Sequence, residues 1–309
     1  MAELMLGPVL RHVGESDATI WVEMTARCEV EVRAGDLASR TPTFTVAGHH
    51  YALVVLAGLA PGSSTAYEVR IDGDVVWPIA GTSFPPSRIR TVDPSRPIRL
   101  IFGSCREVPK SEDAAEGHMD VLDAFTTRML AEEPDHWPDL LVFTGDQVYA
   151  DDTSPAMRRF IRSRRDIRRP PKAEVADFEE YTRLYLESWS APKIRWLLST
   201  MPTSMIFDDH DVRDDWNTSH AWRLDMQKTG WWETRITGAL MSYWIYQHLG
   251  NLSPAGLAAD PTYRSVRAAA DGTQLLETFA RAADREADGA KGTMWSYRRD
   301  FRGCPSARD

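Results

Sequence analysis

The sequence predicts an α/β protein in which a layered sheet and its helices are preceded by a small all-β sandwich. Three observations support this fold class. Short runs in which apolar and polar residues alternate with period two fill residues 1–84. A proline-rich stretch follows at 85–97, where proline disfavours both helices and strand ladders. Beyond it, continuously apolar runs flank a helical pattern, as in a parallel sheet covered on both faces.

The predicted sandwich carries no residue pattern that suggests chemistry. Its strands are expected at 18–24, 28–32, 43–46, 51–56 and 66–71, with Gly, Pro and Asp turns between them. The expected organisation is therefore a β-sandwich at 1–84, a Pro-rich linker at 85–97 and an α/β domain at 98–309.

The α/β domain is predicted from a buried strand, an amphipathic helix and a second buried strand. The apolar runs 98–102 and 140–143 flank a helix at 119–130, and 204–207 is a third strand. A long aromatic helix is expected at 231–249, packed on the core, and its aromatic stripe is less often a ligand site than buried packing.

Composition and charge exclude several classes of protein. The net charge of -9 over 309 residues repels polyanions, which argues against general attraction to nucleic acid or to an anionic membrane. No run is long enough to span a bilayer, and the N-terminus lacks the pattern of an export signal, so a cytoplasmic location is expected. The 3 cysteines are widely spaced and predict neither a disulfide framework nor a clustered zinc motif.

Each predicted strand runs directly into polar residues that suit metal ions. They lie in the segments 103–106 after the first strand, 144–152 after the second and 208–211 after the third, and they include Cys105. Because ligands bind at the carboxyl ends of strands in open α/β sheets, the three segments are expected to meet in one crevice. Five aspartates and a histidine within 208–215 repel one another unless they are solvated, cap a helix or hold a cation.

The three motifs together resemble those of a known family. Gly103-Ser104-Cys105, then Gly145-Asp146-x-x-Tyr149, then Asp208-Asp209-His210-Asp211 are similar to the PhoD-like alkaline phosphatases of the calcineurin-like metallophosphoesterase superfamily. The resemblance implies a layered metallophosphoesterase-type domain after an immunoglobulin- or fibronectin-like sandwich. It also implies a hydrolase that acts on phosphate monoesters or diesters through a metal-activated water.

The resemblance also implies a set of metal ligands. Asp146 would bridge two ions, Cys105 and Tyr149 would bind iron, and Asp209 would bind the second ion, with Asp208 as the alternative ligand. Thiolate and phenolate are strong donors to Fe3+, whereas carboxylate oxygens suit a hard ion such as Ca2+. The implied cofactors are thus Fe3+ and Ca2+, and other divalent metals stay open.

The remaining polar residues near the motifs receive separate roles. His210 would orient the substrate phosphate or protonate the leaving alkoxide. Arg106 and Arg213 could contact phosphate oxygens, although other roles in solvent are equally consistent with the sequence. Asp211, Asp214 and Asp215 are expected to cap, to bind arginine or to face solvent. The expected partner is a small phosphorylated substrate, and the oligomeric state is left open.

Two features of the sequence leave alternatives open. The family typically continues with a further strand and a Gly-Asp-Val-His-type motif after about residue 301, where this sequence instead has a polar tail, so a C-terminally truncated domain is expected. A catalytically inactive remnant that serves at most as a binding fragment is the alternative function. The basic tract 158–169 is expected to face solvent, with attraction of anionic substrates or nucleic acid as weaker alternatives.

Overall fold

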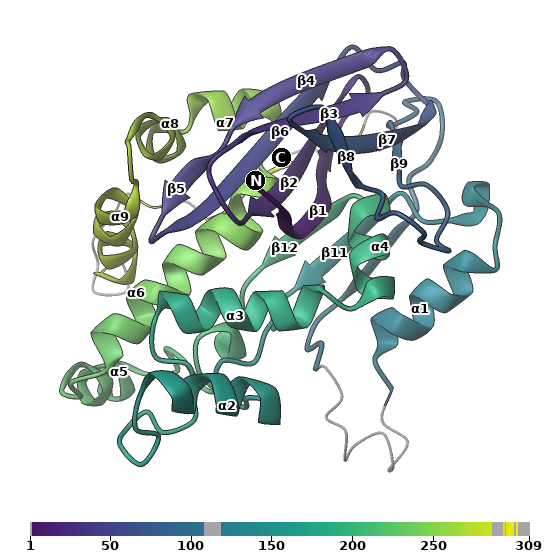
Figure 1. The fold of residues 1–309 in the computed structure, drawn as a ribbon. Helices are drawn as coiled ribbons and strands as arrows, with labels where there is room; N and C mark the ends of the chain where they lie inside the picture. The colour runs from purple at the N-terminus through teal and green to yellow at the C-terminus, as the bar shows by residue number, and fades with distance from the viewer. Residues whose placement is uncertain (1, 108–118, 286–292, 294, 300, 302–309) are drawn as a thin grey trace, which may run out of the picture.

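The computed structural model describes residues 2–107, 119–285, 293, 295–299 and 301. Two antiparallel sheets form the N-terminal part, and a three-stranded parallel sheet surrounded by helices follows (Figure 1). The first sheet contains β1 (Leu4–Val13), β2 (Asp17–Met24), β6 (His49–Ala57) and β5 (Phe44–Val46) in that order. The second contains β4 (Leu37–Pro42), β3 (Glu29–Ala34), β7 (Ser64–Ile71) and β8 (Asp74–Trp77).

The expected linker contributes to the second sheet. β9 (Arg88–Arg90) lies within 85–97 and pairs with β7 in antiparallel orientation. Ile89 is completely buried in the sandwich core, which gives this short segment a reason to pair despite the prolines around it. The sequence pattern did not indicate β1, β4, β8 or β9.

The parallel sheet of the second part has the strand order β10-β11-β12. Its strands are β10 (Leu100–Gly103), β11 (Leu140–Thr144) and β12 (Thr203–Ile206), and both pairings are parallel, so the predicted β-α-β unit is confirmed. β10 lies at one edge of this sheet, and its apolar side chains are exposed, with Phe102 71% accessible.

Nine helices accompany this sheet in the described part of the chain. They are α1 (Val121–Leu130), α2 (Pro155–Arg164), α3 (Phe178–Trp189), α4 (Pro192–Thr200), α5 (His220–Gln227), α6 (Trp232–Ser242), α7 (Pro254–Ala259), α8 (Pro261–Ala268) and α9 (Thr273–Arg285). Asp120, Ser154 and Asp177 accept amide hydrogen bonds at the starts of α1, α2 and α3, as N-cap residues do. None of the described helices has the length and apolar character needed to cross a bilayer.

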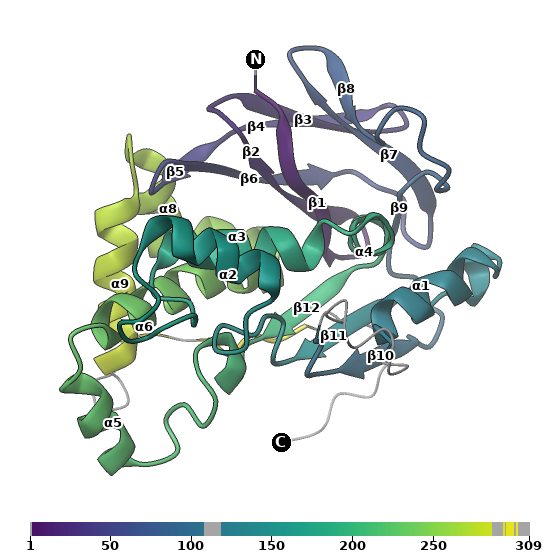
Figure 2. The same ribbon diagram turned by 60° about the horizontal axis from the view of Figure 1, so that its bottom comes forward.

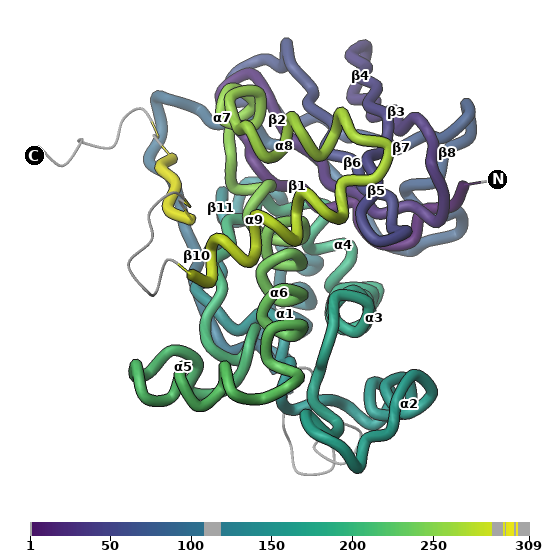
Figure 3. Tube along the Cα trace, turned by 90° about the vertical axis from the view of Figure 1, so that its left-hand side faces the viewer, coloured from purple at the N-terminus to yellow at the C-terminus, as the bar shows by residue number. Residues whose placement is uncertain are grey.

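The aromatic helix expected at 231–249 is present but changes its winding. After α6, residues Tyr243–His248 form a π-helical turn, and Leu249–Asn251 form a 3₁₀ turn. Ile236, Leu240 and Trp244 are all buried, which confirms that the stripe packs in the core. Figure 3 shows α8 and α9 beside the β5 end of the sandwich, where they cover this region.

The first sheet of the sandwich is buried on both of its faces. Along β2, Ile20 and Val22 belong to the core between the two antiparallel sheets. Trp21, on the opposite face, belongs to a second core that also contains residues of α3, α4 and α6. Figure 2 shows α3 and α4 directly beneath β1, so the sandwich and the α/β part share one continuous core.

A polar cluster lies within this shared interface. His49 on β6 bonds to Glu23 Oε1 through Nδ1 at 2.9 Å and to Glu179 Oε2 on α3 through Nε2 at 2.9 Å. Tyr246 donates to Glu23 Oε2 at 2.9 Å. Burial by itself lowers the pKa of His49, but the two carboxylates outweigh it and raise the pKa above its ordinary value. A protonated His49 therefore joins the two parts of the chain.

We predict that His49 makes the stability of the whole chain pH-dependent. Because its pKa is raised by folding, its contribution is complete below the unfolded value of about 6.5 and is lost as pH rises through the folded pKa. His49→Gln should therefore flatten the decline in melting temperature as the pH rises above about 6.5. Thermal unfolding followed by circular dichroism measures this slope.

The neighbouring His50 is a matched control. Burial and the charge of Arg27 lower the pKa of His50, and its Nδ1 bonds to Thr45 Oγ1 at 3.0 Å within the sandwich. His50→Gln should therefore leave the alkaline slope unchanged and raise stability at acid pH. An unchanged alkaline slope in His49→Gln would show that the interface is insensitive to this proton.

Candidate functional site

Three loops meet at the carboxyl edge of the parallel sheet, as the sequence predicts. They follow β10, β11 and β12, whose parallel alignment brings their ends together. The Cys105 amide donates to the Gly145 carbonyl at 3.2 Å, and the Arg106 amide donates to the Asp146 carbonyl at 3.2 Å. The Ala150 amide donates to the His210 carbonyl at 2.9 Å, so backbone bonds join all three loops.

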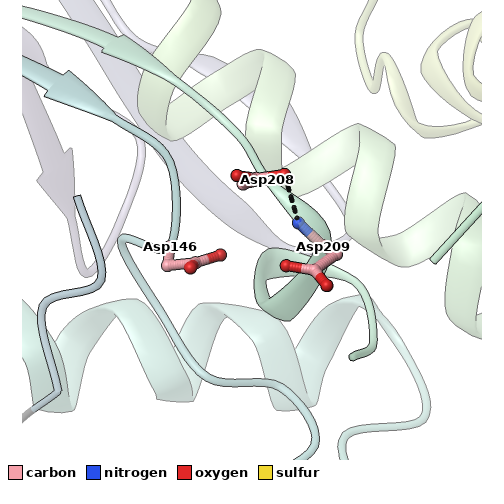
Figure 4. Close-up of side chains that lie close together, drawn as sticks. All are labelled: Asp146, Asp208 and Asp209. Carbon is pink, nitrogen blue, oxygen red and sulfur yellow. Dashed lines mark hydrogen bonds between the residues drawn. The ribbon is translucent and has the colours of Figure 1, made fainter. Parts of the chain in front are cut away.

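Three carboxylates converge where these loops meet. One oxygen from each of Asp146, Asp208 and Asp209 lies within 4.8 Å of the other two (Figure 4). Burial raises the pKa of Asp146, with the charges of Asp208 and Asp209 adding to the effect. A cation between the three side chains would remove this repulsion, because it supplies the missing opposite charge.

The backbone adopts unusual conformations to bring these carboxylates together. Cys105 and Asp146 have φ angles of 56° and 53°, in the left-handed region that side chains other than glycine rarely adopt. Gly145 has φ +122°, and a Cβ there would lie 2.4 Å from the Cβ of Asp208. Such strain costs about 1–3 kcal/mol per residue and is concentrated at functional sites.

Cys105 and Tyr149 lie beside Asp146. The thiol of Cys105 donates to Asp146 Oδ2 at 3.1 Å. A bond with Ser104 lowers the pKa of Cys105, but Asp146 and burial outweigh it and raise that pKa. The pKa of Tyr149 is raised by burial and by the charge of Asp146. Both groups are therefore protonated in the cation-free protein, and a positive ion would favour their ionised forms.

His210 forms a dyad with Asp151, to which the sequence analysis assigned no individual role. Its Nδ1 lies 3.0 Å and 3.1 Å from the two carboxylate oxygens of Asp151. Burial lowers the pKa of His210, but Asp151 outweighs this effect and the pKa is raised. Asp151 follows the Gly145-Asp146 motif by only a few residues, and its acidic character was the one available signal.

Asp211 is buried behind the site and contacts both of its acidic loops. Its Oδ2 accepts from the Asp208 amide at 3.0 Å and from the Gln147 amide at 3.3 Å. With Asp208 it forms a capping box at the 3₁₀ turn Asp209–Asp211, which is one of the three roles that the sequence left open for it. Burial raises the pKa of Asp211 to about 7.

The two arginines considered for phosphate binding are engaged elsewhere. Arg106 Nη2 donates to Asp120 at 2.8 Å, and its Nη1 donates to the Ser188 carbonyl at 2.8 Å. The Arg106 side chain is only 8% accessible. Arg213 lies 3.5 Å from Glu174. A contact from either guanidinium to a substrate would require these bonds to rearrange.

The basic tract 158–169 is tied to acidic side chains. Arg164 donates to Asp177 at 2.7 Å, and Arg165 donates to Glu180 at 2.9 Å. Arg168 pairs with Asp166 at 2.9 Å on the surface. Much of the positive charge of the tract is thus compensated locally, which reduces the field that it could direct toward a distant anion.

The donor set fits one or two metal ions. Carboxylate oxygens of Asp146, Asp208 and Asp209 suit hard cations, and the thiol of Cys105, which is bonded to Asp146 Oδ2, adds a soft donor. A second group of close carboxylates, Asp209, Asp214 and Asp215, is more exposed. These side chains can therefore bind cations, which would place positive charge at one edge of the sheet.

Two family models match the chain. A PhoD-like phosphatase domain matches residues 100–272, and a domain of unknown function (DUF7800) matches residues 1–89. No curated protein matches.

Comparison with solved structures gives a further result on the fold. A structure described as "Structure of PhoD" is similar with a TM-score of 0.53 and 14% sequence identity, over 82% of this chain and 47% of that chain. This chain thus spans about half the length of that one, and at this identity the similarity concerns the fold. The type III pullulan hydrolase from Thermococcus kodakarensis is 10% identical over 75% of this chain and 46% of its own, with a TM-score of 0.21.

We predict that Asp146→Asn weakens cation binding without destabilising the cation-free fold. Burial and the acidic neighbours raise the pKa of the Asp146 carboxyl group, which means that its charge is unfavourable in the folded protein. Because the substitution removes this charge, the metal-free melting temperature should stay equal or rise. Calorimetric titration with Ca2+ and thermal unfolding in chelator measure the two effects. A lower metal-free melting temperature with unchanged Ca2+ affinity would contradict the assignment.

Proposed function

The chain belongs to the PhoD-like phosphatase family, and we propose that it hydrolyses phosphate esters with metal ions held by its three strand-end loops. One observation carries this proposal: Asp146, Asp208 and Asp209 converge beside the His210–Asp151 dyad. A phosphatase needs positive charge for the phosphoryl group and a proton donor for the leaving oxygen. The two features lie next to each other at the edge where α/β sheets bind ligands.

We propose that two different ions occupy the site. Cys105, Tyr149 and Asp146 would hold Fe3+, because thiolate and phenolate are strong donors to that ion. Asp146 and Asp209 would hold Ca2+, and the position of Asp208 supports it as a further ligand on that side. When bound, such ions lower the pKa of a water and neutralise charge on phosphoryl oxygens.

The protein's own residues supply orientation and proton transfer. Asp151 fixes the ring of His210 through Nδ1, which leaves Nε2 as the atom able to exchange a proton. Nε2 lies 3.7 Å from Asp214, the only charged group that the described residues place within ion-pair distance of it. His210 would donate a proton from Nε2 to the leaving alkoxide of a small phosphorylated substrate, monoester or diester.

We propose that Arg106 contacts the substrate phosphate. Its hydrogen bonds also support a second role, in holding the loop after β10. It joins Asp120, the N-cap of α1, to the Ser188 carbonyl at the end of α3. Its own amide also donates to the Asp146 carbonyl. Arg106 would therefore stabilise the loop after β10 even when no substrate is bound.

We predict that Asp146→Asn abolishes phosphoester turnover and that His210→Asn lowers kcat by about 10²–10⁴-fold. Hydrolysis of an aryl phosphate monoester and diester measures turnover, and elemental analysis of the purified chain measures iron and calcium. Asp166→Asn is the matched control, because Asp166 is an exposed aspartate whose ion pair is with Arg168 and not with a residue of the site. It should leave both readings unchanged.

Either of two results would contradict the proposal. One is full turnover in Asp146→Asn. The other is a folded parent chain that holds no metal and hydrolyses neither ester after incubation with iron and calcium.

A further inference from the structure

A buried arginine from the sandwich reaches the back of the candidate site. Arg11 on β1 is completely buried, and none of the described carboxylates forms an ion pair with it. Burial and the nearby Arg299 lower its pKa to about 9. A buried charge without an opposite charge is costly, so its hydrogen bonds must compensate.

Those hydrogen bonds go to the second part of the chain. Arg11 Nη2 donates to the Gln247 carbonyl and, at 3.1 Å, to Asn251 Oδ1. Its Nη1 lies 2.7 Å from the sulfur of Met205 on β12. Asn251 in turn accepts from the Met205 amide at 2.9 Å and donates to the Met205 carbonyl at 2.6 Å. Arg11 therefore fixes the π-helical turn against the strand that leads into the site.

The side chain of Gln247 continues this path toward the acidic loops. Its Nε2 donates to Asp211 Oδ1 at 3.1 Å and to the hydroxyl of Tyr185 at 2.8 Å. The other oxygen of Asp211 accepts the amides of Asp208 and Gln147. One of these amides follows Asp146 and the other precedes Asp209, so a single buried carboxylate sets the separation of the two loops.

Gly250 permits the close packing that this path requires. A Cβ at this position would lie 1.8 Å from Nε of Arg11 and 2.6 Å from its Cζ. Any side chain here would displace the guanidinium. Gly250→Ala therefore offers a way to move Arg11 without changing any hydrogen-bonding group.

We propose that Arg11 and Gln247 are positioning residues for the acidic loops, acting through Asp211, so that the N-terminal sandwich is part of the machinery of the site. The consequence for turnover rests on the proposed phosphatase function, whereas the consequence for loop geometry does not. None of the described sandwich residues is among the proposed metal ligands or proton donors. Through Arg11, the sandwich fixes the positions of the elements that set the spacing of the proposed ligands.

The experiment compares three variants of the full chain with one control. Arg11→Met removes the buried charge and its bonds at similar volume, Gln247→Leu removes the bond to Asp211, and Gly250→Ala displaces Arg11. Arg195→Met is the control, because Arg195 also joins the two parts, through the Gly7 carbonyl and the ring of Trp77. Arg195 has no path to Asp211 among the described contacts.

The first measurement is hydrogen–deuterium exchange of the metal-free proteins. In Arg11→Met, Gln247→Leu and Gly250→Ala, the amides of Gln147 and Asp208 should exchange about tenfold faster, as loss of one ordinary hydrogen bond allows. The second measurement is Ca2+ titration, in which affinity should fall about 10- to 100-fold. The third is kcat/KM on an aryl phosphate ester, which should fall by a similar factor. The control should change none of these.

The outcomes separate this proposal from the proposed function. Unchanged exchange and Ca2+ affinity in Gln247→Leu and Gly250→Ala, with only a lower melting temperature in Arg11→Met, would overturn the positioning role. If the variants show faster exchange and weaker Ca2+ binding while the parent chain hydrolyses no phosphate ester, the positioning role is supported and the phosphatase assignment is refuted. If Arg11→Met does not fold, the other two variants decide.

Discussion

The burial of one antiparallel sheet on both faces is the constraint on which the rest of the structure depends. β2 contributes Ile20 and Val22 to the core of the sandwich and Trp21 to the core of the α/β part. Apolar burial of this kind is the largest favourable term in folding. If the two parts were separated, each would expose apolar side chains that are buried in the shared core. The N-terminal sandwich is consequently a layer of one structure, which explains why polar side chains such as Arg11 and His49 can extend from it into the second part.

Electrostatic repulsion at the carboxyl edge of the parallel sheet is the second constraint. Three carboxylates within one small volume oppose folding, and two left-handed residues at Cys105 and Asp146 add backbone strain. Backbone bonds between the loops and the buried Asp211 hold this arrangement together. The stability of the shared core offsets these costs, and the result is a site that is ready for positive charge.

The spacing of apolar residues in the sequence predicted many of the strands and helices correctly. Period-two alternation indicated β2, β6 and β7, where one face is apolar along its length. β4 was not indicated, because exposed polar side chains interrupt its alternation. β8 was not indicated, because it has only four residues and its register is set by pairing with β7. The π-helical turn at Tyr243–His248 was also not indicated, since its sequence is as apolar and helical as that of α6. The tail after residue 301 lies outside the described residues.

The sequence by itself determined the order of the elements and the types of residue at each strand end, because apolar period and turn chemistry are local properties. Cys105, Asp146, Tyr149, Asp209 and His210 all follow predicted strands, and their roles in a site were implied by the family resemblance. The structure places all five around one edge of the sheet. Only the tertiary structure decided that Asp151 holds His210, that Asp120 and Ser188 engage Arg106, and that Arg11 lies behind Asp211. Some of these contacts join residues that are far apart in the sequence, and others involve an acidic residue that the sequence does not distinguish from the acidic residues beside it. Packing geometry selects the partners, and a local sequence pattern does not contain that information.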